Sequence, residues 1–192
     1  MTRHPRRLES AFTLLEVVIV IALFTIMSFA VIRFFISYNT SYLFERAITS
    51  SSSSAGTLMS EIRSAVLPAD QVLTSHSFGG TTYSSATSTL VLELPSIDSA
   101  GVVISGTYDY IAFYTDGARV YEIIDANAAS NRTSRTRLLS DSLNALTFSY
   151  DNASFPSVTT ITADITTQAG YAGRTTQSHL REQVYLRNLP GS

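Results

Sequence analysis

Residues 12–32 have the sequence FTLLEVVIVIALFTIMSFAVI, and this stretch decides the fold. Its 21 residues are apolar or small with one exception, Glu16. A helix needs roughly 20 such residues to cross a bilayer. Three arginines precede the stretch within residues 1–11, and the next basic residue is Arg33, just beyond it. We therefore predict a transmembrane helix over 12–32, with the N-terminus in the cytoplasm because basic residues favour that side.

The helical pattern continues past the apolar stretch. Residues spaced by three or four positions form a stripe of the kind that faces a packed partner: Phe44, Ile48, Ser51, Ala55, Leu58, Ile62 and Ala65. No proline occurs between residues 12 and 67, so the sequence predicts one long helix over 12–66. The serine-rich run 49–54 and Gly56 have modest helix propensity, which leaves room for a bend there.

Beyond Pro68 the sequence changes to short β-branched and aromatic runs separated by polar turns. These runs predict strands over 89–94, 108–115, 119–124, 143–150, 158–167 and 183–189. Asp116-Gly117 predicts a tight hairpin, and 127–137, 151–156 and 168–177 are expected to be linkers. The expected fold class is α+β, with an antiparallel β-sheet domain over 67–192 packed on the outer half of the helix.

Composition excludes several classes of function. The chain contains no cysteine, which excludes disulfides, thiolate metal sites and cysteine nucleophiles. All 13 basic residues are arginines, so the lysine of a phosphate-binding P-loop is absent. Residues 12–192 carry 10 arginines against 14 acidic residues, a balance that argues against non-specific nucleic-acid binding.

The segment RRLESAFTLLEVVIVI, residues 6–21, resembles the N-terminal motif of type IV prepilins and type II secretion pseudopilins. It combines a short basic leader, a small residue before Phe12, and a lone Glu16 in an apolar helix. The resemblance implies that a prepilin peptidase cuts between Ala11 and Phe12, removing residues 1–11 as a leader, and that the new amine of Phe12 is methylated. It also implies that Glu16 pairs with the N-terminal amine of a neighbouring subunit.

The same resemblance implies an inner-membrane assembly platform and other pilin or pseudopilin subunits as partners. The chain would first be a single-pass protein of the inner membrane, with its C-terminal domain outside, and then part of a filament. Ala11 departs from the family, where glycine is usual, and leaves the efficiency of cleavage open. No cofactor is implied, and an enzymatic role is not expected.

Two absences, a helix proline and a C-terminal disulfide, separate this sequence from many major pilins and favour a minor pilin or pseudopilin. Residues 143–151, 158–167 and 184–188 are similar to the closing strands of larger minor pilins, including the J-type pseudopilins and W-type minor pilins. The sequence leaves open whether the filament serves secretion, adhesion, motility or DNA uptake.

The main alternative is a secreted β-rich binding or enzymatic domain behind an ordinary signal peptide. Ser28-Phe29-Ala30 places small residues where signal peptidase cuts, which would give a mature chain that begins at Val31. The apolar stretch is longer than the usual 7 to 15 residues of such a peptide, and Glu16 interrupts it early. A catalytic site is not expected, because the three histidines are scattered along the chain.

Three polar features have a functional interpretation beside a simpler one. Glu16 could be a protonated or snorkelling side chain near the cytoplasmic face, since an intramembrane carboxylate is costly. Calcium binding would draw on the loop carboxylates of Asp116, Asp125, Asp141 and Asp151, but no EF-hand spacing is present, and we expect no metal site. Arg132, Arg135 and Arg137 could contact DNA, although a solvated polar loop is the simpler expectation.

Overall fold

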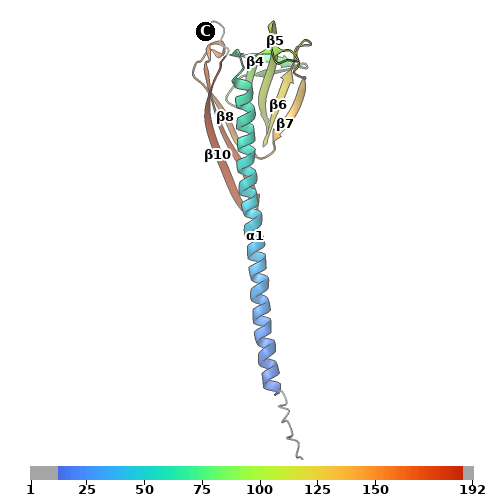
Figure 1. The fold of residues 1–192 in the computed structure, drawn as a ribbon. Helices are drawn as coiled ribbons and strands as arrows, with labels where there is room; N and C mark the ends of the chain where they lie inside the picture. The colour runs from blue at the N-terminus through green and yellow to red at the C-terminus, as the bar shows by residue number, and fades with distance from the viewer. Residues whose placement is uncertain (1–12, 188–192) are drawn as a thin grey trace, which may run out of the picture. The chain divides into compact units, whose positions relative to one another are not determined.

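The computed structural model describes residues 13–187 (Figure 1). The chain divides into two compact units, Met1–Leu43 and Phe44–Ser192. One helix, α1 (Leu14–Val66), forms the described part of the first unit and continues into the second. Residues 49–56, where the sequence left room for a bend, are helical without a break. The rest of the described chain is antiparallel β, so the predicted α+β class with a long N-terminal helix is confirmed.

Among the described residues, two sheets and one additional hairpin make up the β structure, and each of their strand pairs is antiparallel. The five-stranded sheet has the order β1 (Gln71–Val72), β4 (Leu90–Ile97), β5 (Val103–Asp116), β6 (Arg119–Asp125), β7 (Arg135–Ser140). The three-stranded sheet has the order β10 (Arg174–Tyr185), β9 (Thr160–Tyr171), β8 (Leu143–Tyr150). The hairpin consists of β2 (Ser75–Phe78) and β3 (Thr81–Ser84), and a short 3₁₀ turn, η1 (Phe155–Ser157), precedes β9.

The hairpin predicted at Asp116-Gly117 is confirmed. Asp116 pairs with Arg119, and Gly117 adopts a φ of 59°, which a residue with a Cβ rarely tolerates. The linker predicted over 151–156 is also free of strand.

Two of the predicted linkers are wrong. β7 occupies the end of 127–137, and the supposed linker 168–177 is the tip of a long hairpin that joins β9 to β10. β10 therefore begins at Arg174, well before the predicted start at residue 183. Both strands carry many polar residues because they lie at sheet edges, where hydrophobic alternation is weak.

The outer part of α1 forms a common core with both sheets. The predicted stripe is buried from Ser51 onward, whereas Phe44 is half-buried and Ile48 is 43% exposed. The helix residues Leu58 and Ile62 share one cluster with Leu92 of the five-stranded sheet and Ile165 of the three-stranded sheet. The helix thus supplies the apolar surface that each sheet needs on its inner face.

β10 lies lengthwise along α1. The Arg174 guanidinium sits 4.2 Å from the centroid of the Phe44 ring, and Arg63 Nε donates to Glu182 at 2.6 Å. The two helix positions are separated by about 28 Å at 1.5 Å per residue. The two strand positions are separated by about 27 Å at 3.4 Å per residue. The contacts therefore occur in register along the two elements.

Hydroxyl groups join the serine-rich turn of α1 to both sheets. Ser51 Oγ lies 3.1 Å from the carbonyl oxygen of Thr167 on β9, and Thr167 Oγ1 donates to the Ser51 carbonyl at 2.7 Å. Ser54 Oγ lies 2.8 Å from Ser140 Oγ at the end of β7, and Ser142 Oγ donates to Ser54 at 3.1 Å. These hydrogen bonds form a polar seam that joins α1 to β9 and to the end of β7, buried at Ser51 and partly buried at Ser54.

Candidate assembly site

The first turn of α1 holds Glu16 in a helix-capping arrangement. Thr13 precedes the helix, and its Oγ1 accepts a hydrogen bond from the Glu16 backbone N–H at 3.3 Å. Thr13-Leu14-Leu15-Glu16 has the spacing of a capping box, in which a threonine and a glutamate satisfy helix N–H groups. The sequence contains this capping signal, which the interpretation of Glu16 as an intramembrane carboxylate leaves out.

The predicted cleavage junction, Ala11-Phe12, lies outside the described residues. The site that the structure describes therefore consists of Glu16 and the helix surface that follows it.

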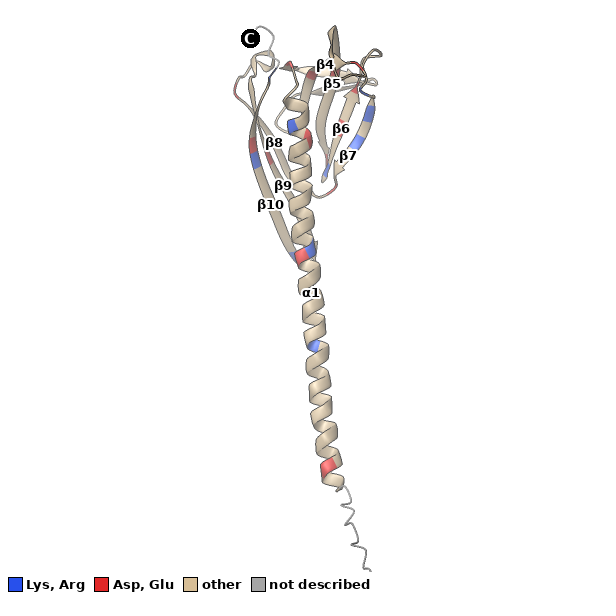
Figure 2. Cartoon of the chain, in the orientation of Figure 1, with Lys and Arg blue, Asp and Glu red and all other residues tan. Residues whose placement is uncertain are grey.

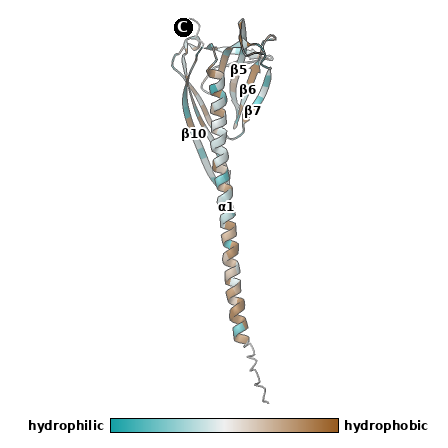
Figure 3. Ribbon diagram, viewed as in Figure 1, coloured by the Kyte–Doolittle hydropathy of each residue, from teal (hydrophilic) through white to brown (hydrophobic). Residues whose placement is uncertain are grey.

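That surface is apolar and uncovered. Within residues 13–39 every side chain except Ser28 is exposed, including large apolar side chains such as Leu14, Phe24 and Val31. Figure 3 shows the hydrophobic colouring along this part of α1, and Figure 2 colours its charged positions, which in the sequence are Glu16 and Arg33. The Thr25 hydroxyl donates to the Ile21 carbonyl at 2.8 Å and so keeps its polar group inside the helix. Among the described residues, α1 is one helix long and apolar enough to cross a membrane.

Aromatic and cationic side chains follow the apolar stretch. Arg33 lies over the Phe29 ring, 5.3 Å from its centroid, and the rings of Phe34 and Tyr38 stack at 6.4 Å. Arginine and tyrosine are common where a helix leaves the hydrocarbon for the headgroup region. The pattern agrees with a membrane boundary near this point of α1.

The three clustered arginines are neither a solvated loop nor a free basic patch, which corrects the simpler expectation. Arg132 Nη1 lies 2.6 Å from Asp109 Oδ2, and Asp109 is fully buried. Arg135 and Arg137 belong to β7 and lie 3.6 and 3.1 Å from Glu122 Oε2. All three positive charges are therefore used within the domain, which argues against a DNA contact here.

The carboxylates considered for calcium do not converge. Asp125 lies 3.2 Å from the His76 ring, and Asp151 accepts a hydrogen bond from the Thr159 N–H at 3.1 Å. In the part of the chain that the structure describes, no three His, Cys, Asp or Glu side chains come together as a metal site would require. His179 lies on β10 and contacts Asp164 of β9 at 2.7 Å, whereas His76 lies on β2 in a different sheet.

Comparison with known families identifies the N-terminal segment. The model of the prokaryotic N-terminal methylation motif matches residues 6–32, which include Glu16 and the exposed apolar part of α1. Comparisons with curated proteins and with solved structures found no match. The matched motif, followed by one long helix and an antiparallel β domain, supports the resemblance to type IV pilins and pseudopilins.

Proposed function

We propose that the chain is a minor pilin or pseudopilin, a non-enzymatic subunit of a type IV pilus or of a type II secretion pseudopilus. The observation that carries this proposal is the methylation motif at residues 6–32, joined directly to a helix whose apolar side chains are uncovered. Exposed apolar surface of this extent needs either lipid or other apolar helices around it. A filament subunit meets both surroundings in turn, first the membrane and then the filament core.

In this proposal residues 1–11 are a leader and residues 12–32 are the membrane anchor. Prepilin peptidase cuts between Ala11 and Phe12 and methylates the Phe12 amine. The chain lies in the inner membrane with its N-terminus in the cytoplasm and its β domain outside, and it then enters the filament with other pilin subunits at an assembly platform. Alanine is the nearest residue in size to the glycine usual at position 11, which supports cleavage at this junction.

Glu16 is proposed to bind the Phe12 amine of a neighbouring subunit. A carboxylate in an apolar environment is costly, and a positive partner offsets that cost. Glu16 also takes part in capping the helix, but it does so through its backbone N–H, which donates to Thr13. Its side-chain carboxylate is therefore left for another partner.

Processing tests the proposal. The full chain is expressed with prepilin peptidase, and the N-terminus of the membrane fraction is determined by intact mass and sequencing. We expect a chain that begins at N-methylated Phe12, and a catalytically inactive peptidase should leave the leader in place. A mature chain that begins at Val31 would instead support a secreted domain behind a signal peptide, and the proposal would fail.

A further inference from the structure

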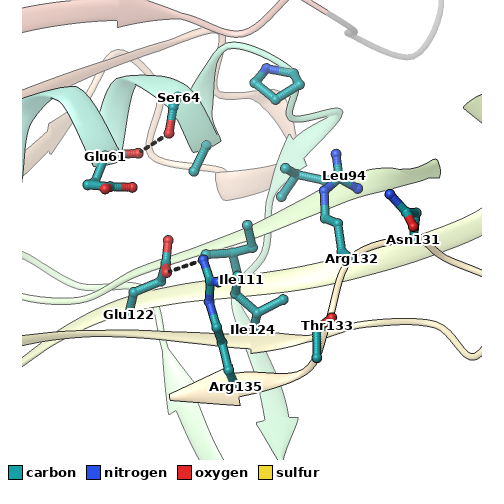
Figure 4. Close-up of a pocket in the computed structure, with 12 residues that line it drawn as sticks. Glu61, Ser64, Leu94, Ile111, Glu122, Ile124, Asn131, Arg132, Thr133 and Arg135 are labelled. Carbon is teal, nitrogen blue, oxygen red and sulfur yellow. Dashed lines mark hydrogen bonds and ion pairs between the residues drawn. The ribbon is translucent and has the colours of Figure 1, made fainter. Parts of the chain in front are cut away.

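The two faces of the five-stranded sheet differ in how their charges are satisfied. A cavity of about 380 Å³ lies on the face toward α1 (Figure 4). Each charged side chain that lines it has an ion-pair partner within the domain: Glu61 pairs with Arg137, Glu122 with Arg135 and Arg137, and Arg132 with Asp109. The face away from α1 holds carboxylates that have no arginine partner.

These carboxylates flank Tyr110. In the strand register Tyr110 lies opposite Glu93 on β4 and opposite Asp125 on β6. Directly opposed residues of an antiparallel pair lie on one face, with Cβ atoms about 4.5–5.5 Å apart. Ile111 and Ile124 belong to the core that the sheet shares with α1, so their strand neighbours Tyr110 and Asp125 face the other way. Tyr110 therefore lies in the middle of a row between two acidic side chains.

Among the described residues, no arginine forms an ion pair with Glu93 or Asp125. Glu93 Oε1 accepts a hydrogen bond from the neutral Gln71 side chain at 2.9 Å, and Asp125 Oδ2 lies 3.2 Å from His76 Nε2. Burial raises the pKa of the Tyr110 hydroxyl, and the negative charges of Glu93 and Asp125 raise this pKa further. The electrostatic potential around Tyr110 is thus negative.

A small cavity of about 180 Å³ opens beside this row. Two tyrosines of β5 line it together with residues at and just after the end of β6: Tyr108, Tyr110, Asp125, Ala126 and Asn127. Tyr108 is 38% exposed, so its ring is accessible from solvent. Sites for whole small molecules usually have roughly 300–1,000 Å³. The smaller volume suits a single group about as large as an amino-acid side chain.

A guanidinium matches the chemistry of this cavity. Aromatic rings attract cations, and a guanidinium is planar, weakly hydrated and able to donate to a carboxylate while it stacks on a ring. Asp125 Oδ1 accepts no hydrogen bond from the described residues and can accept one from a ligand. The domain shows the same ring contact where Arg174 lies 4.2 Å from the Phe44 centroid. We propose that the cavity binds an arginine side chain of a partner protein, whose guanidinium contacts Tyr108 and donates to Asp125.

Nuclear magnetic resonance of the full chain in a maltoside detergent, with isotope-labelled tyrosine rings, tests this site. The probe is N-acetyl-arginine amide. The comparison compounds are N-acetyl-citrulline amide, which has a similar shape without the charge, and N-acetyl-lysine amide, which has the charge without the planar group. We expect the arginine probe to shift the Tyr108 and Tyr110 signals in the millimolar range and to leave Tyr150 of β8 unchanged. The lysine compound should bind at least about threefold more weakly, and the citrulline compound should cause no shift.

The absence of any shift at tens of millimolar arginine probe would overturn the proposal, as would equal binding of either comparison compound. Free L-arginine distinguishes a partner's side chain from a small-molecule ligand. If only the side chain enters the cavity, free arginine should bind within about twofold of the amide. Free arginine that binds more than about tenfold more tightly would show that its charged main-chain groups are recognised, and would overturn the assignment to a partner protein.

Two variants assign the contacts, with the Tyr110 signal as the measurement. Asp125→Asn should weaken binding of the arginine probe at least about fivefold, because a charge-assisted hydrogen bond at a partly exposed site is lost. Tyr108→Leu should weaken binding severalfold, whereas Tyr108→Phe retains the ring and should bind as the parent does. Asp141→Asn changes an exposed carboxylate outside the cavity and should have no effect. Arginine binding that is unaffected by both Asp125→Asn and Tyr108→Leu would overturn the proposal.

Discussion

Asp109 is a fully buried carboxylate that four groups bind. Its Oδ1 accepts from Ser96 Oγ at 2.9 Å and from the Asn127 N–H at 2.8 Å. Its Oδ2 accepts from Ser130 Oγ at 2.7 Å and from Arg132 Nη1 at 2.6 Å. Burial raises the pKa of Asp109, but these hydrogen bonds together hold the pKa below its usual value. Asp109 therefore stays charged and fixes the chain segment between β6 and β7.

This carboxylate predicts how stability depends on pH. Because its pKa is lower in the folded chain than in the unfolded chain, Asp109 stabilises the fold fully above about pH 4. That contribution is lost as the pH falls through the folded pKa. Asp109→Asn should lower the free energy of unfolding at pH 7 by about 3 kcal/mol and flatten the acid dependence, as thermal melts by circular dichroism would show.

The control for this prediction is Asp141→Asn, which changes an exposed carboxylate and should leave both the melting temperature and its pH dependence nearly unchanged. An Asp109→Asn protein with the parent's melting temperature would mean that the buried charge does not stabilise the fold.

Glu16 separates two roles at one position. Glu16→Ala removes both the charge and the side chain of a capping box, whereas Glu16→Gln removes the charge but keeps a residue that can complete the box. If charge pairing drives assembly, both variants should reduce the subunit in sheared filaments by about tenfold or more, since an unpaired buried charge typically costs about 3–5 kcal/mol. Membrane insertion should persist, because a more apolar helix inserts at least as well.

Thr13→Val is the matched variant, because it removes the capping hydroxyl and retains the Glu16 charge. It should enter filaments at a level close to the parent's. Normal assembly of Glu16→Gln together with failure of Glu16→Ala would assign the effect to the cap and contradict the charge pairing.

At the scale of elements, the serine-rich part of α1 shows how local and tertiary preferences differ. Sequence propensity alone leaves room for a bend at 49–56, yet the helix is continuous there. Tertiary contacts compensate for the modest helix propensity, because Ser51 and Ser54 form hydrogen bonds with groups on β9 and β7. No pattern within the helix sequence indicates those partners, which lie 116 and 86 residues away in the chain.

Substitutions along this serine-rich run should therefore change the free energy of unfolding in opposite directions. Ser51→Ala removes the hydroxyl that contacts Thr167 in a buried site, which should reduce the free energy of unfolding by about 1–2 kcal/mol. Ser53→Ala changes an exposed helix position and should raise it by a few tenths of a kcal/mol, because alanine has the higher helix propensity. Urea unfolding of the full chain in detergent compares the two. Equal effects of the two substitutions would show that the hydroxyl seam does not stabilise the fold.

The strands differ in how far the sequence predicted them. The turn at Gly117 and strand β8 follow from local signals, a glycine that accepts a positive φ and a run of alternating residues. β7 was not predicted because its arginines resemble a polar linker. Their carboxylate partners, Glu61 and Glu122, come from distant elements. The cavity between α1 and the five-stranded sheet could not be predicted from the sequence either, because its walls come from segments that only the fold brings together.

At the scale of the whole molecule, the orientation across the membrane is testable. Residues 1–11, the proposed leader, carry three arginines, and the β domain follows the apolar stretch. A C-terminal alkaline phosphatase fusion should be active, because that enzyme matures outside the cytoplasm, and a C-terminal green fluorescent protein exported by the same route should be dark. A stable but inactive phosphatase fusion would show that the orientation is reversed.

A force applied along α1 loads all the contacts between the helix and the three-stranded sheet at the same time. Because β10 runs lengthwise beside the helix and contacts it in register at two levels, a pull on the helix loads these contacts in shear. The Ser51–Thr167 hydrogen bonds share the same load. A pull on the turn between β9 and β10 would instead peel the strands away one contact at a time. The domain is therefore mechanically strongest in the direction in which its helix would be drawn.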